Sequence, residues 1–217
     1  MRRFRTATSR GDDRGAVAVE FALVVPLLVL FVFGMIELSL LLRDYVSTSS
    51  AVRTGARMAS ANAGAGPGTC PTGPSAPPCT PANAPAFAQA AADAIQRAGS
   101  AMPKDSIDEI WIYKANNLGF PGSDGSTSMV CGANCVIYKW NAAADRFYYA
   151  SGSWASSSVN ACLNTSDAVG VYLKATHKYV TGFAFPGRSG PTITVSDRAV
   201  MRFEPLDTQS CAPGNHL

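Results

Sequence analysis

The stretch "RGAVAVEFALVVPLLVLFVFGMIELSLLL", from Arg14 to Leu42, shapes every later inference about this chain. The 27 residues from Ala16 to Leu42 are almost all apolar and, as a helix rising about 1.5 Å per residue, would extend about 40 Å. That length crosses the roughly 30 Å hydrocarbon core of a bilayer, whereas the apolar part of an ordinary secretory signal has only about 7 to 15 residues. The sequence therefore predicts a transmembrane helix over residues 16–42.

Residues 1–15 differ from the rest of the chain in charge. They hold five arginines and two aspartates, which leaves thirteen Lys/Arg and thirteen Asp/Glu of the totals of 18 and 15 for the remainder. An arginine-rich flank marks the cytoplasmic side of an apolar helix, so we predict a cytoplasmic leader over residues 1–15 and an extracytoplasmic chain after Leu42. The balanced remainder lacks the clustered cations of a nucleic-acid-binding surface, so no nucleic-acid partner is expected.

The helical pattern continues beyond the apolar segment. Residues 43–62 contain no proline and repeat at steps of three and four, which predicts one helix over residues 16–62, about 70 Å long. Gly55 weakens this helix by about 1 kcal/mol relative to alanine. The predicted buried stripe consists mainly of small residues: Tyr45, Ser49, Val52, Ala56, Ala59 and Ala63. We expect a globular head to lie against this extension.

Two carboxylates interrupt the apolar helix. A charge inside a bilayer costs a few kcal/mol or more, so each carboxylate needs an explanation. Glu37 lies 17 residues after Glu20, about 25 Å along the axis, and is expected near the far membrane interface. Glu20 follows four apolar residues and needs a partner. Cleavage after Gly15 would supply one, because Ala16 would then carry a free amine and Glu20 would be the fifth residue.

The order of these residues resembles a known family. A basic leader ending in Gly15, then Glu20-Phe21 and an unbroken apolar helix with Pro26 and Glu37, resembles type IV prepilins, and more narrowly the TadE/TadG-like pilus-assembly proteins of tight-adherence (Flp-type) pili. The outer phrases "CGANCVIYKW", "VGVYLKATHKYVTGF" and "VMRFEP" are similar to the longer actinobacterial members. Many members of the family are shorter and contain fewer cysteines.

This resemblance implies a function and a set of partners. A membrane-embedded aspartic prepilin peptidase would cleave between Gly15 and Ala16, and Glu20 would then offset the amine of a neighbouring subunit during assembly. Other pilins and pilus-assembly membrane proteins would be further partners. The chain would be a single-pass protein of the cytoplasmic membrane with its head outside, and it could be incorporated into an extracellular pilus.

The outer part begins with a linker over residues 63–85, whose Gly, Pro, Ser and Thr favour neither helix nor strand. All the cysteines lie in the outer part, and their even number in an oxidising compartment predicts disulfides: Cys70, Cys79, Cys131, Cys135, Cys162 and Cys211. Cys70 and Cys79 are nine residues apart, so a local loop is favoured over pairing elsewhere, since short closure has the smaller entropic cost. The other pairings remain open.

Residues 86–217 are predicted to form an α+β head. The alanine-rich run before Gly99 predicts a short second helix over residues 86–98. β-branched and aromatic runs predict strands at residues 107–115, 135–140, 146–149, 169–181 and 192–203. Residues 146–149 would pair with the preceding strand through the turn at 141–145. The resulting antiparallel sheet of four to five strands is expected to lay its apolar face on the outer half of the first helix.

The sequence gives little support for catalysis. His216 lies in the C-terminal tail, and His177 belongs to the apolar face of a predicted strand. The sequence contains no G-x-S-x-G motif that would supply a nucleophile for a catalytic histidine. Cys131 and Cys135 lack the two further ligands of a zinc site. The sequence has no Walker A loop or dinucleotide fingerprint, so neither a cofactor nor an enzymatic activity is predicted. The tryptophans are expected in the core or on a sheet face: Trp111, Trp140 and Trp154.

Two functions of different kinds fit these patterns. The first is a structural minor pilin or pseudopilin, processed at Gly15, that takes part in assembly of a tight-adherence type pilus or a related secretion system. The second is a signal-anchored exported binding module with a disulfide-bonded head, in which Glu20 has no special role. The mature chain begins at Ala16 only in the first case. The place of the subunit in a pilus and any ligand of the head stay open.

Overall fold

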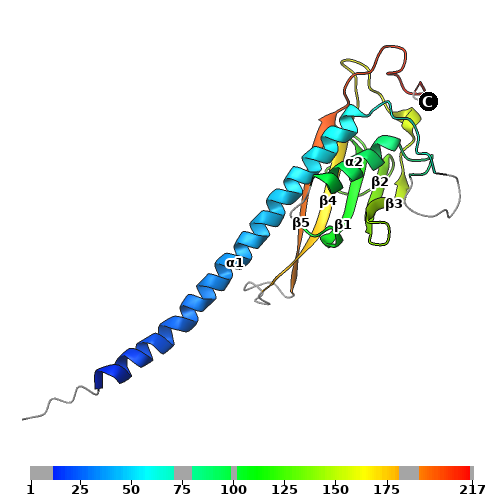
Figure 1. Cartoon of the computed structure of the whole chain (residues 1–217). Coiled ribbons are helices and arrows are strands. Elements are labelled where there is room, and N and C mark those ends of the chain that lie inside the picture. Colours follow the sequence, from blue (N-terminus) through cyan, green and yellow to red (C-terminus); the bar gives the residue numbers. More distant parts are fainter. Residues whose placement is uncertain (1–11, 71–79, 99–101, 181–190, 216–217) are drawn as a thin grey trace, which may run out of the picture.

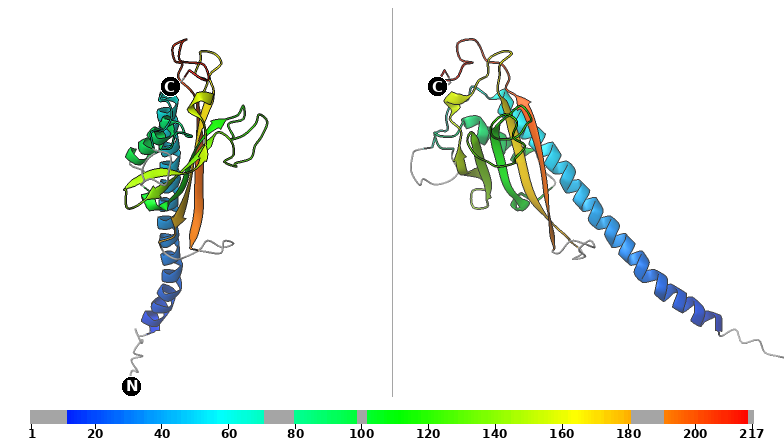
Figure 2. Two further views of the ribbon diagram at one scale, coloured as in Figure 1. Left: turned by 90° about the vertical axis from the view of Figure 1, so that its right-hand side faces the viewer. Right: turned by 180° about the vertical axis from the view of Figure 1, so that it is seen from behind.

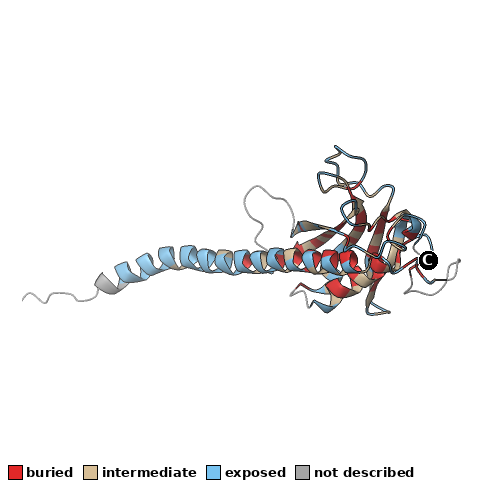
Figure 3. Ribbon diagram, turned by 90° about the horizontal axis from the view of Figure 1, so that it is seen from above, coloured by how far each residue is buried: buried red, intermediate tan, exposed pale blue. Residues whose placement is uncertain are grey.

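The computed structural model describes residues 12–70, 80–98, 102–180 and 191–215. Its dominant element is α1, Asp12–Ala61, a helix of 50 residues that continues through Pro26. The N-terminal half of α1 stands away from the rest of the molecule, and the C-terminal half lies against the head (Figure 1, Figure 3). The predicted single helix, which joins the apolar segment to its extension, is therefore confirmed.

The head contains one antiparallel sheet of five strands in the order β3-β2-β1-β4-β5. The strands are β1 (Ile107–Ala115), β2 (Cys135–Asn141), β3 (Arg146–Ser153), β4 (Ala168–Lys178) and β5 (Thr192–Arg202). The predicted α+β class and the β2–β3 hairpin are both confirmed.

Four strands differ from their predicted bounds. β2 ends one residue later and β5 one residue earlier than predicted, whereas β3 and β4 differ by more. β3 extends to Ser153, beyond the predicted 146–149, and a glycine makes this possible. A Cβ on Gly152 would lie 2.2 Å from the Cys135 carbonyl oxygen of the neighbouring strand. β4 ends at Lys178, whereas the prediction ran to residue 181, which lies outside the described residues.

Both helices cover the same face of the sheet. α1 packs on β4 and β5, while α2 (Ala86–Arg97) lies beside α1 and packs on β3 (Figure 2). Gly55 of α1 permits the close approach of α2, because a Cβ on Gly55 would lie 2.8 Å from Ile95 Cδ1. The largest fully buried side chains of the head include Phe87, Ile95, Ile110, Phe147, Trp154, Leu173 and Phe203. The expected packing of the sheet on the outer half of the first helix is confirmed.

The buried stripe of α1 differs in part from the predicted one. Val52 and the three alanines of the predicted stripe are buried. Tyr45 is 54% exposed, so its assignment to the buried face is wrong. Asp44 and Thr48 occupy the buried face at this level. Apolar periodicity could not find them, because this part of the contact between helix and sheet is polar.

The opposite face of the sheet is partly covered by the loop between β1 and β2. The ring of Tyr113 on β1 lies over Gly170 on β4, where a Cβ would lie 2.2 Å from the ring. The Tyr113 hydroxyl donates a hydrogen bond to the Gly119 carbonyl of the loop (3.0 Å). Arg198 of β5 stacks on the Phe120 ring, 3.5 Å from its centroid. The loop is thereby fixed to β1 and β5.

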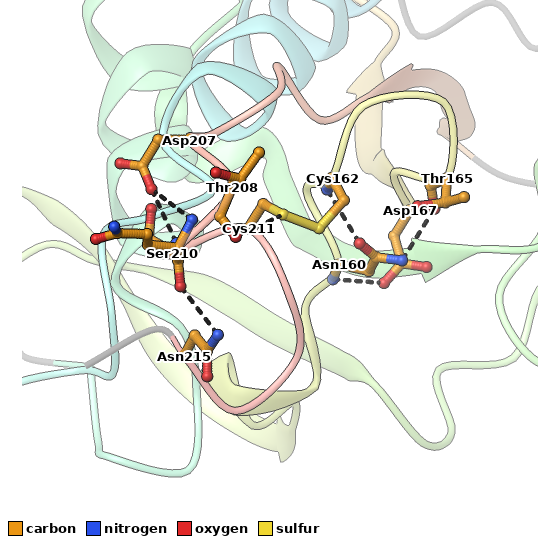
Figure 4. The surroundings of a disulfide bond; sticks show 10 residues. Asn160, Cys162, Thr165, Asp167, Asp207, Thr208, Ser210, Cys211 and Asn215 are labelled. Atoms are coloured by element: carbon orange, nitrogen blue, oxygen red, sulfur yellow. Dashed lines mark hydrogen bonds between the residues drawn. A yellow bond between two sulfur atoms is a disulfide. The ribbon is translucent and has the colours of Figure 1, made fainter.

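Two disulfides join described residues of the head. Cys131–Cys135 closes the end of the β1–β2 loop onto the start of β2, so these two sulfurs are bonded to each other. Cys162–Cys211 connects the segment before β4 to the C-terminal segment (Figure 4). Cys79 lies outside the described residues, so the loop between Cys70 and Cys79 remains a prediction.

Candidate functional site: the exposed helix and its junction with the head

The N-terminal half of α1 presents large apolar side chains to its surroundings. Phe21 is 69% exposed, Leu23 is 73% exposed and Met35 is 61% exposed. Among the described residues, α1 is the one helix that is long and apolar enough to cross a membrane, and the most apolar 18-residue window in it has no buried residue. An exposed apolar helix of this kind fits a single-pass membrane anchor.

The predicted processing and assembly residues lie together near the start of this exposed helix. Gly15, Ala16, Glu20 and Phe21 are all exposed and helical. The Gly15–Ala16 bond lies within the first turns of α1, because the helix begins at Asp12. The structure thus brings these four residues to one end of the rod, at the opposite end from the head (Figure 1).

The junction between α1 and the head is built from ionisable side chains. Glu37 is 2% exposed and faces the end of β4. Its Oε1 accepts a hydrogen bond from the Val180 backbone N–H (3.0 Å) and lies 3.5 Å from Nε2 of His177. The carboxylate that the sequence placed near the far membrane interface therefore has protein partners and is shielded by them.

His177, on the buried face of β4, also contacts a second carboxylate. Its Nδ1 lies 2.7 Å from Oδ2 of Asp44, a residue about two helical turns after Glu37 on the same face of α1. The Tyr179 ring lies edge-on to the imidazole at a centroid distance of 5.6 Å. We call Glu37, Asp44 and His177 the junction cluster. Because buried ionisable groups require partners, the cluster fixes the level at which β4 meets α1.

The sequence placed only part of the junction cluster. The prediction that His177 lies on the apolar face of a strand is confirmed, since this side chain is 4% exposed. Asp44 was missed. The available signal was a pair of acids seven residues apart on one helix face, together with a histidine at a strand position that alternation predicts to be buried.

The junction cluster combines one histidine with two carboxylates, a combination that also occurs in catalytic sites, so its neighbouring groups and its exposure matter. The Thr48 hydroxyl, one turn after Asp44, donates to the Asp44 carbonyl (2.9 Å) and not to the imidazole. Within the described ranges, no group of three His, Cys, Asp or Glu side chains could hold a metal ion. With every member at most 4% exposed, the cluster suits holding two elements together rather than reacting with a substrate.

The three tryptophans lie in separate environments, as expected of core and sheet-face residues. Trp154 is fully buried, with its ring 5.1 Å from that of Phe87. Trp111 lies on the outer face of the sheet beside Tyr172, 5.0 Å between centroids. Trp140 of β2 lies under the Lys104 ammonium. These contacts give each ring a structural role.

The structure combines a long helix that is exposed over its first half with a disulfide-bonded α+β head, and buried acids join the two. This architecture fits a protein with a single-pass membrane anchor. Residues 15–57 match the model of the family described as TadE-like protein, which confirms the resemblance drawn from the sequence. Over this segment, which runs from Gly15 past both acids of the junction cluster, the chain is similar to the TadE-like family, and the similarity suggests a pilus-assembly-related protein. Comparison with curated proteins and with solved structures finds no match.

Proposed function

We propose that the chain is a minor pilin or pseudopilin that a prepilin peptidase processes between Gly15 and Ala16. It takes part in assembling a tight-adherence type pilus or a related secretion system, as a structural subunit without catalytic activity. The observation that carries this proposal is the extent of the TadE-like match, which begins at Gly15 and covers residues 15–57. The matched segment is the exposed helix and its junction with the head, so the helix is the part that assembles.

The proposed orientation places residues 1–15 in the cytoplasm and the head outside. The arginines of the leader support this direction, because positive flanks stay on the cytoplasmic side. The disulfides Cys131–Cys135 and Cys162–Cys211 support it independently, because such bonds persist in oxidising compartments. The head would thus reach its partners on the outer side of the membrane.

Processing would change the charge at the start of the helix. Gly15 lowers the local helix stability by about 1 kcal/mol relative to alanine, which eases the unwinding that a peptidase needs to reach the Gly15–Ala16 bond. Cleavage removes the leader and leaves an amine on Ala16. Glu20 is exposed, so the amine of a neighbouring subunit can reach its carboxylate and offset the cost of a charge in the bilayer.

Two measurements test the proposal. N-terminal sequencing of the protein from its native membrane should find Ala16 as the first residue. Glu20→Gln, which keeps the shape of the side chain and removes its charge, should abolish incorporation into filaments and leave membrane insertion intact. Glu204→Gln, which removes an exposed carboxylate from the head, is the matched control and should assemble normally.

The opposite results would favour the other function that the sequence allows. Recovery of the chain with its arginine-rich leader intact, or unchanged filament assembly by Glu20→Gln, would contradict processing and the role of Glu20. The chain would then be a signal-anchored binding module, in which α1 only tethers the disulfide-bonded head.

A further inference from the structure

The face of the sheet that points away from both helices carries a mixed set of aromatic and charged side chains. Ile110, Tyr138 and Leu173 belong to the core on the helix side, so their neighbours along each strand point to the outer face. The outer-face residues of the three central strands lie side by side because these strands pair in register. Five of them form what we call the outer-face patch: Glu109 and Trp111 on β1, Lys139 on β2, and Tyr172 and Lys174 on β4.

Two aromatic rings lie against each other in the outer-face patch. Trp111 and Tyr172 are opposite in the β1–β4 register, with ring centroids 5.0 Å apart and both side chains partly exposed. Trp111 Nε1 donates a hydrogen bond to Oε2 of Glu109 (2.8 Å), which fixes the orientation of the indole. The β1–β2 loop holds Tyr113 buried on the same face but leaves these two rings accessible. Together the rings form a small apolar platform with a polar edge.

Charged side chains lie next to this platform. Glu109 faces Lys174 in the β1–β4 register, and its Oε1 lies 3.3 Å from Lys139 Nζ on β2. The carboxylate of Glu109 is therefore placed between two lysines. The Lys139 side chain is 48% exposed and Lys174 is partly exposed, so both ammonium groups can reach a molecule that lies on the sheet. Two positive charges against one negative charge give the patch a net attraction for anions.

We propose that the outer-face patch binds an acidic polysaccharide, a chain of sugar rings that bear carboxylates. The apolar face of a sugar ring lies on Trp111 and Tyr172, and sugar hydroxyls donate hydrogen bonds to Glu109. The carboxylates of the polymer accept charge-assisted hydrogen bonds from Lys139 and Lys174. This inference goes beyond the proposed role in assembly, because it gives the head a ligand of its own, and it does not depend on cleavage at Gly15.

Glu109 favours a polysaccharide over other anionic polymers. A nucleic acid carries a phosphate on every nucleotide and is bound by clusters of cations, whereas here a carboxylate lies between the two lysines. An acidic protein segment would likewise set its own carboxylates beside that of Glu109. A polysaccharide also brings many hydroxyl groups, which are donors that a carboxylate accepts.

The test uses the full chain in a non-ionic detergent and measures binding by isothermal titration calorimetry at low ionic strength, where screening of exposed charges is weakest. Polygalacturonate is the probe, and dextran is the uncharged comparison. Polygalacturonate should bind severalfold more tightly than dextran, and added salt should weaken it. Lys174→Gln should lower the affinity for polygalacturonate severalfold, and Trp111→Ala should abolish binding.

Lys104→Gln is the matched control for the loss of one charge. The Lys104 ammonium lies over the ring of Trp140, a residue that packs against the core on the helix side of the sheet. This variant should bind polygalacturonate as the unsubstituted chain does. Circular dichroism of each variant shows whether the head is folded, and Lys174→Gln, which changes a partly exposed side chain, keeps the test informative if Trp111→Ala is unstable.

Several results would overturn the proposal. These are an absence of polygalacturonate binding, equal binding of dextran, or an affinity that neither Lys174→Gln nor Trp111→Ala changes. Tighter binding of single-stranded DNA or of polyglutamate, lost in the same two variants, would also overturn it and assign the patch to a nucleic acid or to an acidic protein. An uncleaved chain carries the same patch, so failure here is distinct from failure of processing.

Discussion

Gly170 lies opposite Tyr113 in the β1–β4 ladder, and its missing side chain leaves the space that the phenol ring fills. The ring is fully buried and held by the hydrogen bond to Gly119, so it has little freedom to move away from a new Cβ. Gly170→Ala is therefore expected to destabilise the head by about 1–3 kcal/mol, the usual cost of overpacking. Thermal unfolding followed by circular dichroism measures this.

Gly132→Ala is the control for this substitution. A Cβ on Gly132 would meet no atom within 4 Å, so its unfolding midpoint should equal that of the unsubstituted protein. If Gly170→Ala unfolds at that same midpoint, the Tyr113 ring is not confined as described.

The same tyrosine makes the stability of the head depend on alkaline pH. Burial raises the pKa of Tyr113 from 10.0 to about 12, although the positive charge of Arg198 acts in the opposite direction. The folded state thus favours the neutral phenol. This contribution is complete below pH 10 and is lost as the pH rises through about 12.

Spectroscopic titration of tyrosinate in the folded protein tests this prediction. Tyr113→Phe should remove a titration step near pH 12 and leave the steps of exposed tyrosines unchanged. Tyr138 also has a pKa raised by burial, so a second late step should remain. Loss of a step near pH 10 instead would show that the Tyr113 hydroxyl is accessible to solvent.

The packing of α1 on α2 depends on Gly55 in the same way. A Cβ on Gly55 would lie 2.8 Å from Ile95 Cδ1, and Ile95 is fully buried. Gly55→Ala raises the helix propensity of α1 by about 1 kcal/mol, but the clash with Ile95 is expected to cost more than this gain. We therefore expect Gly55→Ala to lower the midpoint of thermal unfolding.

A double-mutant cycle identifies the source of that cost. Ile95→Ala removes both side-chain atoms that a Cβ on Gly55 would approach most closely, so Gly55→Ala should be stabilising in that background. If Gly55→Ala lowers the stability equally in the unsubstituted protein and in the Ile95→Ala variant, the strain does not come from Ile95.

The elements themselves followed from the sequence where periodicity was strong. β1 has the predicted bounds, and His177 lies on the buried face of β4 as predicted, because alternation of apolar residues is typical of a half-buried strand. The end of β3 could not be predicted from the sequence, because its pairing with β2 depends on the close approach of the two backbones at Gly152. The junction cluster did not follow either, since it depends on the level at which β4 meets α1, and His177 and Asp44 are 133 positions apart in the chain.

The whole molecule divides into a rod that leaves the head at Glu37 and a head that packs against one face of the rest of α1. The TadE-like match crosses this boundary and ends at residue 57, so the matched segment includes both the exposed helix and the face that the sheet covers. The junction cluster lies at the boundary between these two parts.

Two head fragments should show how much the junction cluster contributes to stability. A fragment of residues 34–217 keeps Glu37 and Asp44, whereas one of residues 46–217 lacks both acids together with the turns of α1 that carry them, so His177 loses both partners. Loss of the partners of a buried polar group costs about 1–3 kcal/mol, and each kcal/mol lowers the midpoint of a domain of this size by about 2–4 °C. The shorter fragment should therefore unfold several degrees lower by circular dichroism, and Asp44→Asn in the longer fragment should fall between the two. Equal midpoints for all three would mean that β4 is held on α1 by the apolar contacts around Val52 alone.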